Sequence, residues 1–425
     1  MKTHSLITSL KGLRGNARGC VYTEPIWGIP YNLYIPYVSL YMVALGLSDK
    51  QIGLTVSISW AFQIFFALMS GVITDKLGRR LTTLIFDIVS WSVPALISAL
   101  AQNYWYFLGA AIINSAWRVT HNSWTCLMVE DTDPDQLVDI YSWVYIAGLL
   151  VAFLTPLAGL LIRSFTLVPT MRGLYLFASV MFMVKCITTY RLTKETGQGK
   201  MRMHATKHQS VIMILGEYRG VLRDVLHTPQ TLYTGAIMLI MSICMLINGT
   251  FWAIIVTEKL HIPTQNLALF PFVKSVIMLV FFFVIIPRLR RVHFKVPLVL
   301  GFAGFILSQA LLITIPEKGY ALLLVSILLE ACSTAVVSPL VDQMTVRTVD
   351  PQERARIQSI LYVGIILLTS PFGWIAGMLS QADKNLPFIL NICLFAVGGV
   401  LAYLAGEASK KRNLAATLGA ETTLL

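Results

Sequence analysis

Apolar stretches of about twenty residues recur along this chain, separated by short segments that carry most of its charge. A helix of that length spans the hydrocarbon core of a lipid bilayer, which is roughly 30 Å thick. Only 13% of the residues are charged, against about 25% in a typical soluble domain. Because lipid does not tolerate unpaired backbone groups, the chain is expected to be an all-α membrane protein.

The pattern predicts twelve transmembrane helices, arranged as two pseudo-symmetric six-helix bundles. The predicted spans are residues 25–47, 52–74, 81–101, 104–127, 138–162, 172–190, 230–256, 267–287, 296–315, 320–344, 357–380 and 387–406. They divide the chain into an N-terminal bundle over 1–190, a cytoplasmic linker over 191–229, and a C-terminal bundle with a short cytoplasmic tail over 230–425. Apolar residues between 211 and 225 recur at helical spacing, which predicts an amphipathic helix in the linker, either on the membrane face or docked on the spans.

Positive charge is unevenly distributed between alternate loops. With the N-terminus inside, 24 of the 33 Lys and Arg residues fall in cytoplasmic segments and six in outer loops. Cytoplasmic loops carry such an excess, so we expect both termini to be cytoplasmic and the protein to lie in the inner (cytoplasmic) membrane. The same bias accounts for the net charge of +12, so no nucleic acid partner is expected. No apolar run with a cleavage site precedes the first span, so no removable signal peptide is expected.

A weak internal repeat relates the two halves. The loops after the fourth and tenth predicted spans contain Asp133-Pro134 and Asp350-Pro351, which are 217 residues apart. A proline follows in the next span of each half, at Pro156 and Pro371. Many secondary transporters are built from such repeats, with the solute site near the middle of the membrane between them.

The loop between the second and third predicted spans reads Gly71-Val72-Ile73-Thr74-Asp75-Lys76-Leu77-Gly78-Arg79-Arg80. It resembles the signature loop of the major facilitator superfamily, Gly-x-x-x-Asp-(Arg/Lys)-x-Gly-(Arg/Lys)-(Arg/Lys), at every constrained position. The resemblance implies the fold of that superfamily and secondary transport. It also implies that Asp75 helps to latch the inner gate, against the start of the eleventh span near Arg354 and Arg356.

The residue types of this loop have a physical interpretation as well. A glycine at position 71 lets a neighbouring helix approach closely, and Gly78 permits a tight turn. Asp75, beside three basic residues, can pair with charges or helix ends. The predicted gating residues are Gly71, Asp75, Gly78, Arg79, Arg80 and Glu130. The alternative is that Arg79 and Arg80 only mark the topology and that Glu130 belongs to a solvated loop.

Arg118 and Glu330 are ionisable residues near the centres of the fourth and tenth predicted spans. Such a residue costs about 2.5–3.5 kcal/mol at mid-membrane, so its presence needs a reason. The superfamily architecture implies that these two spans border a central cavity, which both side chains could share. Arg118 is predicted to anchor a carboxylate, phosphate or polarised hydroxyl, and Glu330 to exchange a proton. The alternatives are a permanent structural ion pair and a carboxylate that never titrates.

Polar and aromatic side chains form stripes on the first and fourth predicted spans. Asn114, Arg118, His121 and Thr125 share one helical face, and Trp27, Tyr31, Tyr34 and Tyr41 form another beside Asn32. Aromatic rings next to such donors suit sugars or ring-bearing solutes, although aromatic packing and interface anchoring explain them equally well. The predicted substrate-binding residues are Arg118, Asn114, His121, Asn32, Tyr34, Trp117 and Asn248. Asn248 could instead join two helices.

Three further charges lie away from the ends of predicted spans. Asp87 is expected to pair within the inner gate, Lys185 to extend its ammonium to the membrane surface, and Lys274 to line the outer vestibule. The six cysteines are scattered singly, which indicates small buried residues.

The sequence contains no phosphate-binding loop, zinc spacing or nucleophile elbow, so we expect neither an enzyme nor a cofactor or metal site. It predicts a secondary active transporter that moves a small polar or amphipathic solute by alternating access. Coupling to protons and a monomeric state in the lipid bilayer are expected. The alternative function is a non-transporting membrane sensor or partner subunit that retains the same fold.

Overall fold

A computed structural model describes residues 12–133, 136–207, 229–284, 295–348 and 354–422, and every regular element within these ranges is helical. The described residues divide into two compact units. The first contains α2 to α12 together with residues 263–272 and 373–378, and the second contains the rest of the described chain from residue 229 onwards.

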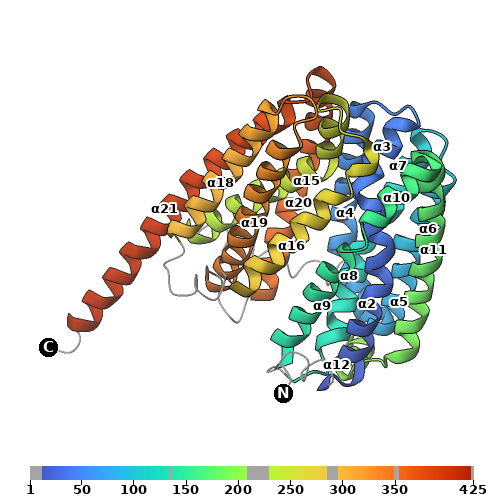
Figure 1. The fold of residues 1–425 in the computed structure, drawn as a ribbon. Helices are drawn as coiled ribbons and strands as arrows, with labels where there is room; N and C mark the ends of the chain where they lie inside the picture. The colour runs from blue at the N-terminus through green and yellow to red at the C-terminus, as the bar shows by residue number, and fades with distance from the viewer. Residues whose placement is uncertain (1–11, 134–135, 208–228, 285–294, 349–353, 423–425) are drawn as a thin grey trace, which may run out of the picture. The chain divides into compact units, whose positions relative to one another are not determined.

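The helices of the first unit are formed by the N-terminal half of the chain (Figure 1, blue to green). They are α2 (Gly15–Tyr34), η1 (Ile35–Tyr37), α3 (Val38–Ala44), α4 (Asp49–Leu77), α5 (Arg79–Asp87), η2 (Ile88–Ser92), α6 (Val93–Ala99), α7 (Tyr104–Asn114), α8 (Trp117–Val129), α9 (Leu137–Ala152), α10 (Pro156–Phe165), α11 (Leu167–Leu192) and α12 (Gly197–Thr206). Within the unit, α2 packs against α11, α8 and α9, and α8 also packs against α4 and α5.

The later part of the chain forms a second series of helices (Figure 1, yellow-green to red). They are α15 (Pro229–Ile254), η4 (Ile255–Lys259), η5 (Thr264–Asn266), α16 (Leu269–Val284), α18 (Lys295–Thr314), α19 (Tyr320–Thr348), α20 (Arg354–Ala382) and α21 (Leu386–Thr422). The predicted amphipathic segment at residues 211–225 lies outside the described residues.

Ten helical stretches among the described residues are long and apolar enough to cross a membrane. They confirm the prediction of an all-α membrane protein. The first and fourth predicted spans are not among the ten, because neither forms the single long apolar helix that we expected.

Both regions are interrupted, one at a proline and the other at a serine. In the first span, Pro36 stands at the start of the short 3₁₀ turn η1, which separates α2 from α3; a proline cannot donate the hydrogen bond that a continuous α-helix needs. In the fourth span, the Ser115 hydroxyl donates to the Ile112 carbonyl, and the backbone N–H of Ala116 donates to Ile113. The side chain competes for helical carbonyls and the chain tightens into i→i+3 bonds between α7 and α8.

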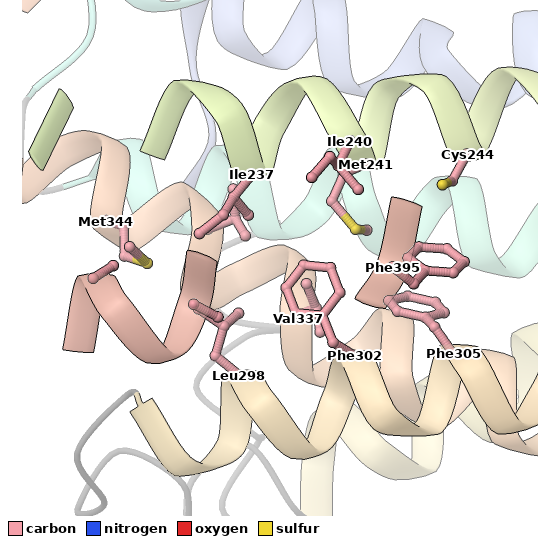
Figure 2. Close-up of a cluster of buried hydrophobic side chains, with 13 residues drawn as sticks. Ile237, Ile240, Met241, Cys244, Leu298, Phe302, Phe305, Val337, Met344 and Phe395 are labelled. Atoms are coloured by element: carbon pink, nitrogen blue, oxygen red, sulfur yellow. The ribbon is translucent and has the colours of Figure 1, made fainter. Parts of the chain in front are cut away.

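The core of the second unit is apolar and closely packed. Figure 2 shows one cluster in which side chains of α15, α18, α19 and α21 meet, among them Met241, Phe302, Val337 and Phe395. The Phe305 and Phe395 rings stack with centroids 4.6 Å apart. Glycines allow this close approach: a Cβ at Gly398 would lie 2.6 Å from the Phe302 ring. Dispersion contacts and burial of apolar side chains therefore hold these four helices together.

Candidate functional site

The first unit encloses a cavity of about 580 Å³. Residues of α2, α4, α5, α7, α8 and α11 line it, together with the short segments η1, α3, η2 and α6. Every lining residue belongs to the first unit. A volume of this size lies in the usual range for sites that bind small molecules.

Aromatic rings form much of the cavity wall. Trp27 stacks on Tyr31 with ring centroids 4.5 Å apart, and the Trp91 ring meets Trp27 edge-on at 5.0 Å. Tyr34 packs against Tyr175 at 4.7 Å. The interlocked rings present rigid, flat surfaces to the cavity, which suit the apolar face of a ring-bearing solute.

A π-helical turn brings Trp91 to this wall. It is the segment η2, and it begins directly after Asp87. The Asn114 side-chain amide donates to the Ser90 carbonyl at 2.7 Å, and the Ser179 hydroxyl donates to the Ser92 carbonyl at 2.9 Å. Irregular backbone at membrane depth is tolerated where it lines a cavity and where side chains satisfy its carbonyls.

Arg118 lies in this cavity wall, on the first turn of α8. Its Nε donates to Oε1 of Gln63 at 2.9 Å, and its guanidinium carbon lies 4.2 Å from the centre of the Trp117 ring. Gln63 is buried on α4 and was not singled out from the sequence. The amide and the indole hold the guanidinium in one orientation, as a fixed anchor requires.

Asp87 and Lys185 form an ion pair against the same cavity. The Lys185 Nζ lies 2.5 Å from Oδ2 of Asp87, and Lys185 and Asp87 are only 4% and 2% exposed. The prediction that Lys185 extends to the membrane surface is therefore wrong, because Asp87 on α5 offers the ammonium a nearby partner inside the bundle.

Glu24, on α2, also lines the cavity and interacts electrostatically with both members of this pair. It was not predicted as a site residue because it stands just before Pro25, where the first span was expected to begin. A signal was available, since a lone carboxylate next to twenty apolar residues needs the same explanation as Arg118.

Two donors in the wall have no hydrogen-bond partner among the described residues. They are the Thr120 hydroxyl and the indole N–H of Trp124, both on α8 and both buried. The Trp124 ring also lies 5.9 Å from the Lys185 ammonium. Buried polar groups are almost always paired, so these two atoms mark a position where a bound molecule can accept hydrogen bonds.

The structure places the predicted substrate-binding residues in three different settings: the cavity wall, a hydrogen bond within α2, and the second unit. Arg118, Asn114, His121, Tyr34 and Trp117 line the cavity of the first unit. The Asn32 amide instead donates to the Gly28 carbonyl at 2.8 Å, within its own helix.

Asn248 and Glu330 lie in the second unit. Asn248 Oδ1 accepts from Asn391 at 3.0 Å, so this amide joins α15 to α21. Glu330 pairs with Lys274 at 2.7 Å, between α19 and α16.

The signature loop forms a charged cluster at the junction of α4 and α5. Arg79 contacts Asp75 and Glu130, each at 3.0 Å, and Arg202 of α12 reaches Asp75 at 2.7 Å. Gly78 has φ of +84°, so the tight turn predicted for it is confirmed. Arg354 and Arg356, the expected partners of Asp75, have side chains outside the described residues.

Glu195 completes the cluster from the end of the sixth span. Its two oxygens accept from the backbone N–H groups of Arg79 and Arg80, each at 2.9 Å, and so cap the start of α5. The Arg80 guanidinium donates to the Tyr190 carbonyl at 2.7 Å. The close helix approach predicted at Gly71 is wrong for the described residues, because a Cβ there would meet nothing within 4 Å.

The chain is similar in fold to solved transporter structures. The nucleoside transporter NupG superposes with a TM-score of 0.69 at 15% identity, covering 93% of this chain and 99% of that chain. A variant of the peptide transporter POT, in complex with sulfate, gives 0.68 at 13% identity, covering 96% and 99%. The human organic anion transporter MFSD10 (TETRAN) gives 0.64 at 13% identity, covering 91% and 98%. At these identities the likeness concerns the fold alone.

A comparison with curated proteins finds no significant match. The family model of the Major Facilitator Superfamily, in contrast, matches residues 27–318, well over half of the chain. This match confirms the resemblance first seen in the loop at residues 71–80. The chain belongs to the Major Facilitator Superfamily.

Proposed function

We propose that the protein is a secondary active transporter that moves a small polar or amphipathic solute by alternating access. The cavity of the first unit carries this proposal. It combines a fixed guanidinium, aromatic walls and buried polar atoms that have no hydrogen-bond partner among the described residues. Such a site suits a solute with an apolar face and several hydrogen-bonding groups.

Each polar group of the site has a proposed role. Arg118 holds a carboxylate, phosphate or hydroxyl of the solute through its planar fork. The Thr120 hydroxyl and the Trp124 indole donate to oxygens of the solute, while Trp27, Tyr31 and Trp91 support its apolar face. Asn114 holds the π-helical turn in place rather than the solute, since its amide is engaged by Ser90.

The charged cluster around Asp75 and Arg79 is proposed to act as the inner gate. Its ion pairs join α4, α5, the end of α8 and α12, so a movement of these helices has to break or exchange them. The domain division at 1–190, 191–229 and 230–425 is proposed with it, as the two halves that move. A monomer in the cytoplasmic membrane, with both termini inside, completes the proposal.

Glu330 is proposed to exchange the coupling proton in the second unit. Its ion pair with Lys274 is partly exposed, with 13% of the Glu330 side chain and 33% of the Lys274 side chain accessible. A pair of this kind can open when the carboxylate is protonated. If Glu330→Gln left proton-driven movement of the solute intact, this assignment would be wrong.

The transport function is tested in two steps. A thermal-shift screen of the purified protein against sugars, nucleosides, amino acids, organic anions and cationic drugs should identify a stabilising solute, because a ligand of the native state raises Tm by mass action. Reconstituted vesicles should then move that solute when a proton gradient is imposed. Binding without flux would instead support the alternative of a non-transporting sensor.

Arg118→Ala gives the matching test of the site. Loss of a charged hydrogen bond to the solute should weaken binding by about 1.5–3 kcal/mol, or roughly 10- to 150-fold. Arg163→Ala, at an exposed position of α10, is the control and should bind as the parent does. Equal affinity of the Arg118 variant and the parent would exclude the anchor role.

A further inference from the structure

Glu24, Asp87 and Lys185 bring two carboxylates and one ammonium to one wall of the cavity. The ammonium lies on Asp87, at 2.5 Å. Glu24 has no hydrogen-bond or ion-pair partner among the described residues, although it interacts electrostatically with both of the others. With all three groups ionised, the cluster therefore carries one negative charge that nothing beside it neutralises.

Aromatic rings lie next to the cluster. Trp27 follows Glu24 by one turn, and the Trp124 ring covers Lys185 at 5.9 Å. A carboxylate in such surroundings interacts weakly with solvent, and an uncompensated charge at membrane depth is costly. A proton on Glu24 removes the excess charge and leaves the Asp87–Lys185 pair undisturbed.

The backbone next to the cluster supports a functional role. The π-helical turn η2 starts at the residue after Asp87, and π-helical turns are frequent at functional sites. Thr120, only 6% exposed, lines the same cavity, and its buried hydroxyl has no hydrogen-bond partner among the described residues. These observations are independent of the carboxylates and indicate a site for an exchangeable ligand at this wall.

We propose that Glu24 binds and releases a proton at this wall, with the Asp87–Lys185 pair as its fixed electrostatic partner. The proton comes from hydronium in the cavity, whose O–H bond breaks to leave water; it forms an O–H bond with one oxygen of Glu24 and returns to water as hydronium on release. The cluster alternates between a net charge of −1 and zero. The inference rests on the proposed transport function. It gives the first unit of the protein a proton-coupling site that is separate from Glu330 in the second unit.

Other ionisable groups lie near the cluster: the Cys186 side chain on α11 hydrogen-bonds to Asp87, and three tyrosines, Tyr31, Tyr34 and Tyr175, line the same cavity. Cys20 lies one turn earlier on α2, and Arg118 and His121 of α8 line the same cavity. α9 and α10 also pack against α2, but they contribute no lining residue. Their ionisable residues away from the cavity include Asp139, Tyr141, Tyr145 and Arg163.

Infrared difference spectroscopy of the purified full-length protein tests the proposal with the proton itself as the ligand. Acidification should produce a protonated-carboxyl band, and Glu24→Gln should lose one carboxyl of its intensity. Glu317→Gln, at an exposed carboxyl of the second unit, is the control and should leave the Glu24 contribution in place. Asp87→Asn should shrink that contribution, because it frees Lys185 to pair with Glu24.

A second variant distinguishes loss of the carboxyl group from loss of the folded structure. Glu24→Asp keeps a carboxyl at the same position, so it should shift the frequency of the band rather than remove it. A Glu24→Gln spectrum identical to that of the parent, or a Glu24→Asp band at the parent frequency, overturns the proposal. These results are independent of solute flux, so an absence of flux in the vesicle assay removes the transport function without altering the titration.

Discussion

The two units of the molecule differ in what their helices bury. In the first, helices meet around a cavity with an ion pair and a lone carboxylate in its wall. In the second, four helices meet in an apolar cluster of tightly packed side chains (Figure 2).

The internal repeat makes this difference specific. Adding the 217-residue offset to Glu24, Asp87 and Lys185 gives Met241, Gly304 and Ala402. Met241 and Ala402 both belong to the apolar cluster of the second unit. At these three positions the first half therefore carries charged groups, where the second half carries a methionine, a glycine and an alanine.

The largest expected effect comes from breaking the buried pair of the first unit. Lys185→Met leaves Asp87 charged and uncompensated, which should destabilise the protein by about 3–5 kcal/mol. Thermal unfolding in detergent measures this as a large fall in apparent Tm. The double variant Lys185→Met with Asp87→Asn should recover most of the loss. A single variant as stable as the parent would contradict the buried pair.

A smaller loss is expected from overpacking the apolar cluster of the second unit. Gly398→Ala places a methyl group 2.6 Å from the Phe302 ring, which should cost about 1–3 kcal/mol. Gly399→Ala, the neighbouring control, meets Phe302 at an ordinary contact of 3.6 Å. The same unfolding assay should separate the two variants, and equal changes in both would mean that the contact with Phe302 does not decide the loss.

The cap on α5 should matter less than either core. Glu195→Ala removes the acceptor for two backbone N–H groups, with an expected loss of about 0.5–2 kcal/mol. Lys194→Ala, at an exposed neighbouring side chain, is the control. Hydrogen exchange of the amides at Arg79 and Arg80 should increase in the Glu195 variant alone. Unchanged exchange at both amides would argue against the cap.

The smallest effect is expected at the ion pair of the second unit. Because 33% of the Lys274 side chain is accessible, Lys274→Met should change stability by only about 0–1 kcal/mol. A double-mutant cycle with Glu330→Gln measures the pair itself. A coupling as large as that of Asp87 with Lys185 would remove the contrast between the two units.

Patterns local in sequence predicted much of the fold. The apolar stretches predicted membrane helices, because length and hydropathy suffice to place a helix in lipid. The signature loop predicted the tight turn at Gly78, which needs only the conformational freedom of one residue. The breaks at Pro36 and Ser115 were also visible as residue types, but the hydropathy of the whole span outweighed them in the prediction.

Tertiary structure decided which polar side chains meet. The sequence alone determined a helical membrane protein with the superfamily's signature loop. It also showed a few ionisable residues inside the predicted spans, whose presence in the membrane needed a reason. It could not predict that Asp87 meets Lys185, because the two residues are 98 positions apart and their contact depends on how α5 and α11 rotate against each other. The role proposed for Glu24 also depends on that contact, because Asp87 occupies the ammonium with which Glu24 could otherwise pair.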